Sequence, residues 1–238
     1  MANVRKFSEN VYVIDSDYAE LWVAEKGQVE NADYYYGGTR TVPFDSNDKA
    51  CEKICYLKDY ESGLKNVFIN DVIALGKLDG IKEEVPAGYL ESRVGGGRCI
   101  IRPKSKEIYD IVMDPAHERY GEIADSMFCD LGAFLNEKGG KIKLTPDFGR
   151  FVGLADMLHK YTENVLGVKC ESGGCGGKAS YTSTGIIEAI EVLGLNQDKS
   201  IPVTLIGSDG AVACAVLEYL IEQNYTNIAV CDLSYATP

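Results

Sequence analysis

One stretch near the carboxyl end of the chain constrains the fold most, because strand, turn and helix signals follow one another there without interruption. Residues 201–206 form an apolar run typical of a buried strand, and the turn residues Gly207–Gly210 follow directly. Residues 211–223 have the composition of a helix, and the apolar residues 227–231 predict a second strand that ends on Asp232. A unit of this kind opens a doubly wound α/β sheet. We therefore expect the α/β fold class, with the start of a Rossmann-like dinucleotide-binding domain at this end.

The rest of the chain also mixes strand and helix patterns. Apolar residues at helical spacing predict two helices, over residues 118–138 and 151–165, and Gly139-Gly140 ends the first of them. Residues 59–85 follow neither pattern and have the character of an insertion, whereas residues 170–180 are rich in glycine and predict a loop. Further predicted elements are strands over 11–14, 21–24, 99–101 and 141–144, a helix opened by residues 45–48, and a helix over 185–193 capped by Thr182-Ser183-Thr184.

The chain carries a strong negative charge, with 36 acidic against 24 basic residues and a net charge of −12. This charge argues against nucleic acid and anionic membranes as partners, because their phosphate groups would be repelled. No apolar run approaches the ~18 residues of a transmembrane helix, and residues 1–6 lack the apolar stretch of a signal peptide. We therefore expect a cytoplasmic protein.

The eight cysteines fit that compartment as reduced thiols. Neither Cys51 with Cys55 nor Cys170 with Cys175 has the two-residue spacing of a zinc site, and the chain has only two histidines. We therefore predict no metal site.

Three consecutive glycines, Gly95, Gly96 and Gly97, lead into the predicted strand 99–101. Since glycine has no Cβ, either backbone or a ligand can approach closely there, and a tight bend before the strand is the alternative interpretation. The run ends on Arg98, whose fixed positive charge suits a carboxylate.

Six short motifs stand in an order that is typical of one enzyme family. They are Gly37-Gly38-Thr39-Arg40, Phe44-Asp45-Ser46, Gly95-Gly96-Gly97-Arg98 with the strand after it, Thr145-Pro146-Asp147-Phe148-Gly149, Ser180-Tyr181-Thr182-Ser183-Thr184-Gly185, and the segment Ile206–Asp232. In this order they resemble the glutamate/leucine/phenylalanine/valine dehydrogenase family, closest to its leucine and phenylalanine branch. The resemblance covers residues 20–58 and 86–238.

The resemblance implies an amino-acid substrate and a nicotinamide cofactor. Enzymes of this family oxidise an amino acid to an imine by hydride transfer, and the imine is then hydrolysed to a keto acid. By resemblance, residues 1–185 form an α/β substrate-binding and oligomerisation domain, and residues 186–238 form part of a Rossmann-like dinucleotide-binding domain. A homo-oligomer is expected to form through the N-terminal strands, residues 11–24.

The resemblance also assigns site residues. Asp147 matches the catalytic aspartate, and Arg98 matches a catalytic position that also contacts substrate. Predicted substrate-binding residues are Gly38, Gly96, Gly97 and Arg98, and predicted cofactor-binding residues are Thr182, Gly207, Ser208, Asp209, Gly210 and Asp232. An acid at position 232, 25 residues after Gly207, suits a ribose hydroxyl and repels a 2′-phosphate, so the predicted cofactor is NAD. The alternative for Asp232 is an ordinary acid at a strand end.

Three departures from the family pattern bear on the reaction. Arg98 stands where the family has its catalytic lysine, and arginine stays protonated, so it cannot act as a general base. Residues 85–88, where the family has a second lysine, contain none, although Lys82 is nearby. In the cofactor turn, Asp209 replaces the second glycine and opposes a pyrophosphate, unless Gly210 provides a variant spacing.

The sequence thus leaves three functions open. The first is NAD-dependent oxidative deamination of an L-amino acid, or the reverse reductive amination. The second is a catalytically altered or inactive relative that binds an amino acid or keto acid. The third is a non-redox enzyme that forms an imine or enamine, with Asp147 as acid and Arg98 as carboxylate clamp. Because Pro238 follows Asp232 by six residues, we also expect either a truncated chain or a naturally shortened relative.

Overall fold

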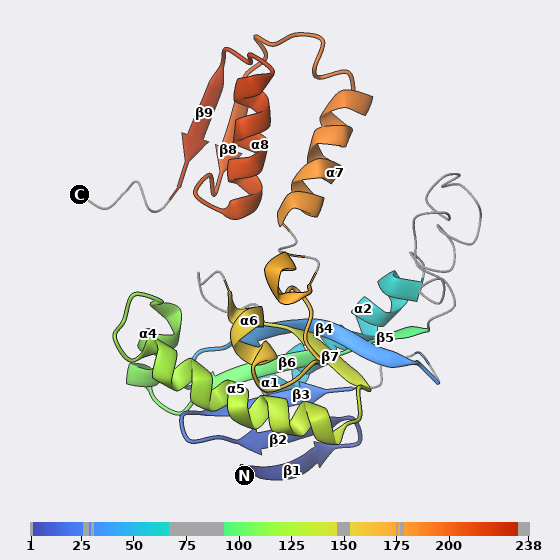
Figure 1. The fold of residues 1–238 in the computed structure, drawn as a ribbon, viewed down its shortest axis with the longest axis vertical. Helices are drawn as coiled ribbons and strands as arrows, with labels where there is room; N and C mark the ends of the chain where they lie inside the picture. Colours follow the sequence, from blue (N-terminus) through green and yellow to red (C-terminus); the bar gives the residue numbers. More distant parts are fainter. Residues whose placement is uncertain are drawn as a thin grey trace. The chain divides into compact units, whose positions relative to one another are not determined.

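The computed structural model describes residues 2–25, 29, 31–66, 93–146, 153–174, 176 and 179–232. The chain divides into two compact units, Met1–Cys175 and Gly176–Pro238, which are drawn in Figure 1. The expected boundary at residues 185 and 186 falls inside helix α7 (Ala179–Val192) of the second unit. The predicted α/β fold class is confirmed, since both units combine helices with β-sheet.

The first unit is built on one mixed sheet with the order β1-β2-β3-β6-β4-β5, and β7 also pairs with β4. The pairs β1–β2, β2–β3 and β3–β6 are antiparallel, whereas β4 runs parallel to β5, β6 and β7. The strands are β1 (Asn3–Ser8), β2 (Val11–Asp15), β3 (Ala19–Ala24), β4 (Tyr34–Thr41), β5 (Val94–Gly96), β6 (Arg98–Pro103) and β7 (Ile142–Thr145).

The glycine run does not form the tight bend offered as an alternative. Tyr36 pairs with Gly96 and Thr39 pairs with Cys99, so β5 and β6 follow the same edge of β4 in one unbroken register. The N–H of Gly97, between the two strands, donates to the carbonyl of Tyr36 at 3.0 Å. The run stays extended because it is hydrogen-bonded to β4 along its length. Likewise, Gly37-Gly38 belongs to β4 itself and not to a turn.

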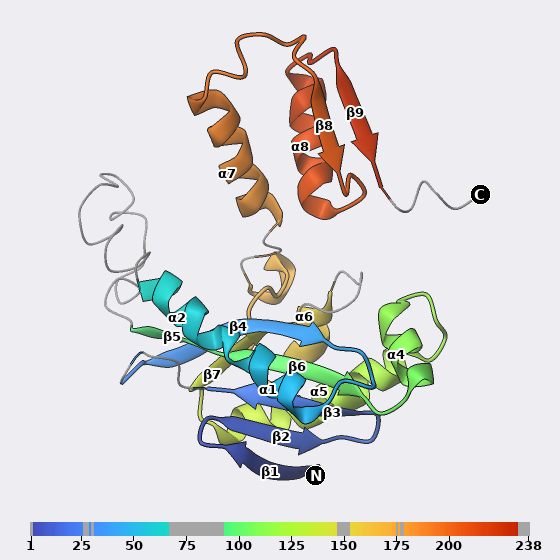
Figure 2. The ribbon, with the colours of Figure 1, turned by 180° about the vertical axis from the view of Figure 1, so that it is seen from behind.

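Helices cover both faces of this sheet, as the opposite views of Figures 1 and 2 show. Strand residues alternate between the faces: Trp22 and Ile100 pack in the cluster that includes Cys51 and Cys55, and Leu21 packs in the larger cluster around α5. The described helices of the unit are α1 (Asp48–Cys55), α2 (Leu57–Asn66), α4 (Lys106–Met113), α5 (Tyr120–Glu137) and α6 (Leu154–His159), with a short 3₁₀ turn at Cys170–Ser172.

The sequence predicted α1 and α5 well. Asn47 caps α1 by accepting a hydrogen bond from the N–H of Ala50 at 3.0 Å, and α5 occupies nearly all of the predicted 118–138. The predicted helix 151–165 is wrong in extent, because the chain leaves α6 to pair with β7. Leu144 donates to the carbonyl of Asn164 at 3.2 Å and accepts from the N–H of Leu166 at 2.9 Å.

Two other predictions concern residues of this unit. The expected insertion 59–85 begins within α2, which continues to Asn66, and residues 67–92 lie outside the described part of the chain. The strands expected to form an oligomer interface, residues 11–24, lie inside the sheet as β2 and β3, where Val13 and Trp22 are fully buried. Within the described residues, the sheet edge on this side is β1, which pairs only with β2.

The second unit contains the strand–turn–helix–strand pattern that the sequence predicted. Strands β8 (Val203–Ile206) and β9 (Ile228–Cys231) pair in parallel, and α8 (Ala211–Glu222) connects them. Val216 and Leu220 on α8 pack against the strands in a small core. Helix α7 begins at Ala179, so Thr182-Ser183-Thr184 lie within the helix and do not cap it. Ser183 and Thr184 donate their hydroxyl protons to the carbonyl of Ser180.

Of the helices that the structure describes, none is long and apolar enough to span a membrane.

Candidate functional site

The glycine run is packed against the protein's own backbone. A Cβ on Gly96 would overlap the carbonyl of Lys58 on α2, and a Cβ on Gly37 would overlap the carbonyl of Gly97. Helix α2 is held in this position because the N–H of Gly96 donates to the hydroxyl of Ser62 at 2.5 Å. The glycines are therefore required first for the close approach of β4, β5 and α2.

Arg98 begins β6 at the end of this run and is 5% exposed. Its Nη2 donates to Oε1 of Glu61 on α2, which forms a largely buried ion pair. Its Nη1 lies 3.5 Å from the position that a Cβ on Gly38 would take. Arg98 Nε is buried without a hydrogen-bond partner among the described residues. The guanidinium thus has one side bound to Glu61 and another side facing β4 at Gly38.

A buried lysine, Lys58, lies on the same helix and is 2% exposed. Its Nζ is 3.8 Å from Oδ1 of Asp59 and 4.9 Å from the centre of the Tyr56 ring. The sequence did not indicate this residue, because the family has its second lysine much closer to the glycine run, at the position of residues 85–88. The sequence feature that could have indicated Lys58 is the helical spacing of Cys51, Cys55, Lys58 and Ser62. These four residues are buried, and they continue one helical face across the break between α1 and α2.

The thiols near Arg98 are buried, and burial favours their protonated form. Burial raises the pKa of Cys55 to about 12, although the positive charges of Lys58 and Arg98 partly offset the rise. Burial also raises the pKa of Cys99. These cysteines therefore do not supply a thiolate nucleophile.

The structure brings the predicted substrate residues Gly38, Gly96, Gly97 and Arg98 together around α2. The register of β4 with β7 places Thr145 opposite Gly38, and the hydroxyl of Thr145 donates to Tyr36 Oη at 3.1 Å. The motif that carries Asp147 therefore starts beside Gly38. Asp147 itself lies outside the described residues, as does Lys82.

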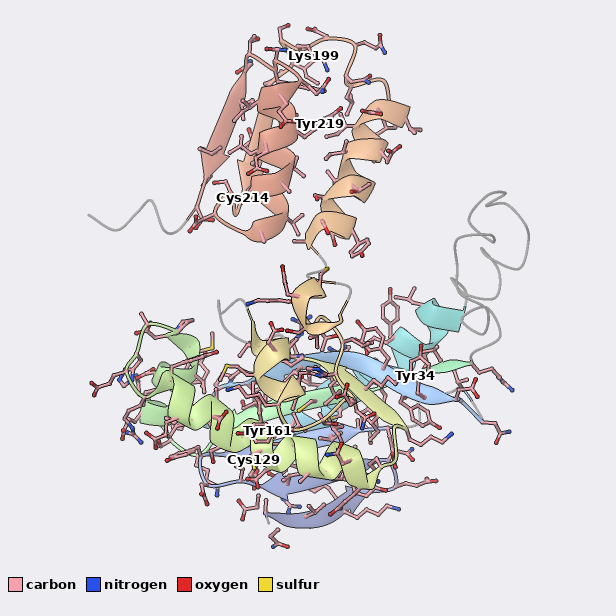
Figure 3. The ribbon with its side chains drawn as sticks, in the orientation of Figure 1. Tyr34, Cys129, Tyr161, Lys199, Cys214 and Tyr219 are labelled. Carbon is pink, nitrogen blue, oxygen red and sulfur yellow. The ribbon has the colours of Figure 1, made fainter. Side chains whose placement is uncertain are left out.

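The second unit brings the predicted cofactor turn and Asp232 together. Gly207 has a φ of +78°, and the N–H groups of Gly207 and Ser208 donate to the carbonyl of Cys231 at 2.8 and 3.3 Å. Asp209 donates its backbone N–H to Oδ2 of Asp232 at 3.0 Å. The turn is further braced by Cys214 at the start of α8 (Figure 3), whose thiol donates to the carbonyl of Ser208 at 3.3 Å.

A depression of about 540 Å³ adjoins this turn. Its walls are mostly apolar and come from α7, β8, the turn and the first half of α8. The lining residues are Ile186, Thr204, Leu205, Ile206, Gly207, Gly210, Ala211, Val212, Ala213 and Val216. Thr182, the remaining predicted cofactor residue, is exposed on the first turns of α7 and does not belong to this lining.

The fit of this turn to a dinucleotide is uneven. Asp232 at the end of β9 has the position and charge for a ribose hydroxyl, and Gly207 and Gly210 leave the start of α8 accessible. The carboxylate of Asp232 already accepts the N–H of Asp209, however, so this donor is not free for a phosphate. The additional carboxylate of Asp209 weakens the positive potential at the start of α8.

No protein-family model matches the chain, and no curated protein matches it. Three solved structures resemble it in fold. L-tryptophan dehydrogenase from Nostoc punctiforme has 17% sequence identity and a TM-score of 0.51, and the match covers 90% of this chain and 50% of that one. A glutamate dehydrogenase has 13% identity and a TM-score of 0.54, and a lysine-to-leucine mutant of glutamate dehydrogenase has 13% and 0.52. Each glutamate dehydrogenase match covers 90% of this chain and 42% of the other.

The chain thus spans half or less of the length of these structures. The similarity supports the predicted dehydrogenase-type fold and does not favour the leucine and phenylalanine branch that the motifs suggested. The chain therefore shares its α/β fold with amino-acid dehydrogenases.

Proposed function

We propose that this chain is an amino-acid dehydrogenase-like protein that carries out the NAD-dependent oxidative deamination of an L-amino acid, or the reverse reductive amination. In this proposal residues 1–185 bind the substrate and assemble a homo-oligomer, and residues 186–238 contribute to binding NAD. The observation that carries the proposal is Arg98, a buried guanidinium held among glycines and turned toward Gly38.

Arg98 supports the binding of a carboxylate-bearing substrate. A guanidinium offers several donors in a fixed plane and binds a carboxylate more strongly when water is excluded, as it largely is at this position. Arg98 cannot accept the proton that leaves the amine, so we assign that step to Asp147, whose motif begins beside Gly38. Among the described residues, the buried lysine is Lys58. It lies on α2, the helix that packs against the glycine run.

NAD supplies the acceptor for the hydride when it is bound. The residues that would hold it are Gly207, Ser208, Gly210 and Asp232, with Thr182 as a further predicted contact. Asp232 favours NAD over its 2′-phosphorylated form, because a phosphate beside this carboxylate would be repelled.

The direct test is the absorbance of NADH after mixing the protein and NAD with each standard L-amino acid in turn. We expect one group of amino acids to give a signal, and Arg98→Gln to abolish it. An exposed arginine, Arg93→Gln, is the control for a lost positive charge. A blank result across the whole panel would contradict the dehydrogenase proposal.

One observation favours the second candidate, a relative that binds an amino acid or keto acid without NAD. The N–H of Asp209 is bound to Asp232, and the Asp209 carboxylate stands where the family has a glycine. Calorimetry separates the candidates: amino-acid binding without any heat from NAD supports the binding protein, whereas micromolar NAD affinity supports the dehydrogenase.

A further inference from the structure

We infer that Glu61 and Arg98 form a two-ended clamp for a zwitterion, in which Arg98 binds the carboxylate and Glu61 binds the ammonium group of an amino acid. Glu61 is then a specificity-determining residue that makes the site prefer an amino acid to the matching 2-keto acid. This inference rests on the proposed function, because it assigns the ligand of the same site.

The geometry of Arg98 leaves a side for the ligand. Its Nη2 is bound to Glu61, whereas its Nη1 faces Gly38. Among the described residues, Arg98 Nη1 is the only heavy atom within 4 Å of a Cβ placed on Gly38, apart from the neighbouring residues of the chain. A carboxylate can therefore meet Nη1 over Gly38 while Nη2 keeps its contact with Glu61.

The carboxylate of Glu61 lies at the same strand. A Cβ on Gly37 would come within 2.7 Å of Glu61 Oε2, so the paired glycines place Glu61 against one residue of β4 and Arg98 against the next. Glu61 has a side-chain exposure of 22%, compared with 6% for Arg98. The side chain of Glu61 as a whole is thus the more exposed of the two, although its Oε2 has almost no exposed surface.

The charges decide which ligand this arrangement prefers. An amino acid brings one negative and one positive group, so the carboxylate meets Arg98 and the ammonium meets Glu61, and each poorly solvated charge gains an opposite charge. A keto acid brings only the carboxylate, which would then lie beside the carboxylate of Glu61. Like charges in a poorly solvated site repel, and this repulsion discriminates against the keto acid.

The experiment is calorimetry on the intact chain, with and without NAD. The probes are L-leucine, L-phenylalanine, L-tryptophan and L-glutamate, each compared with the 2-keto acid that has the same side chain. For the pair that binds, we expect the wild-type protein to bind the amino acid at least about tenfold more tightly than the keto acid, since a bond to a charged group is commonly worth such a factor. In Glu61→Gln the preference for the amino acid over the keto acid, expressed as the ratio of their dissociation constants, should fall to about threefold or less, mainly through tighter binding of the keto acid.

Two variants complete the test. Glu107→Gln is the matched control, because it also breaks a Glu–Arg pair, the exposed pair with Arg119 at 2.8 Å, and it should leave the ratio unchanged. Glu61→Asp keeps the charge and should retain the preference if Glu61→Gln does not fold. A wild-type protein that binds the keto acid as tightly as the amino acid overturns the clamp while leaving the proposed function standing, and so does a Glu61→Gln ratio equal to that of the wild type. A wild-type protein that binds none of the probes overturns both.

Discussion

At the scale of single residues, the molecule places several charged groups in poorly solvated positions. Arg98 has Glu61 as a strong partner, but Lys58 is buried with its ammonium 3.8 Å from Asp59 and above the ring of Tyr56. Withdrawing an ammonium group from water costs free energy that a contact of this length compensates only in part. Arg98 and Lys58 therefore differ in their contributions to the free energy of folding.

We expect Lys58→Met to raise the free energy of unfolding by about 1 kcal/mol, because methionine fills the same volume without a charge to desolvate. Urea denaturation of the wild type and the variant measures the change. Lys53→Met, at an exposed position of α1, is the control and should have no comparable effect. Destabilisation by Lys58→Met would show that the ammonium group is structurally required.

A second residue-scale prediction concerns Tyr161, which lies beside α5 near Cys129 (Figure 3). Its hydroxyl donates to Oδ2 of Asp125 at 2.6 Å, and this hydrogen bond raises the pKa of Tyr161 to about 12. In the unfolded chain the phenol ionises near pH 10. The folded state holds the proton more tightly, so this contribution is full below pH 10 and is lost as the pH rises from about 10 through 12.

Denaturation curves measured across this pH range should show that the wild type loses stability with a steeper slope than Tyr161→Phe. Asp125→Asn removes the charged acceptor and should also reduce the slope. Equal slopes for wild type and Tyr161→Phe would contradict the assignment of the raised pKa to this hydrogen bond.

At the scale of elements, the position of α2 depends on glycine at the facing strand. The carbonyl of Lys58 occupies the space that a Cβ on Gly96 would need, and Ser62 is hydrogen-bonded to the N–H of Gly96. The same helix also carries Glu61, so the seating of α2 determines whether Glu61 reaches Arg98. Packing and the candidate site are therefore linked through one helix–strand contact.

We expect Gly96→Ala to destabilise the protein by about 3 kcal/mol, the upper range for overpacking, because α2 must move away from β5. The matched control is Gly63→Ala on α2 itself, where a Cβ would have no described neighbour within 4 Å. Alanine there should stabilise the helix by about 0.5–1 kcal/mol. Thermal unfolding measures both changes; the same small effect from both substitutions would mean that α2 does not pack on Gly96 as described.

At the scale of the whole molecule, the two units differ in how much core protects their strands. Strands β2, β3 and β6 are buried by apolar clusters on both faces. The described sheet of the second unit has two strands and a small cluster around Val216 and Leu220, and Ile206 of β8 is 83% exposed. Local stability follows the apolar contacts that must be opened, so the units should differ in hydrogen exchange.

We expect the amide protons of β2, β3 and β6 to exchange at least about tenfold more slowly than those of β8 and β9, because a tenfold factor requires only a small difference in opening free energy. Hydrogen–deuterium exchange followed by mass spectrometry measures this difference. Leu220→Ala, which removes a fully buried side chain, should accelerate exchange in β8 and β9. Comparable protection in both sets of strands would contradict the expectation.

The sequence by itself determined the elements whose signals are local. The strand, turn, helix and second strand over residues 201–231 were predicted correctly, as were a helix opened by residues 45–48 and nearly all of α5. The expected burial of the first of these strands was wrong, because β8 has no buried residue. Periodicity, caps and turn residues act within a few positions along the chain, so they can be recognised without knowledge of the fold. The order of the motifs, similarly, predicted the dehydrogenase-type fold.

Only the tertiary structure decided which distant residues meet. Glu61 and Arg98 are 37 positions apart, and no local pattern indicates that α2 lies on the glycine run and presents Glu61 to the guanidinium. The early end of α6 has the same origin, because pairing with Leu144 replaces helical hydrogen bonds beyond His159. Such contacts depend on strand register and helix seating, which the whole chain sets together. The sequence thus identified Arg98 as a cation for a carboxylate, and the fold supplied the acid beside it.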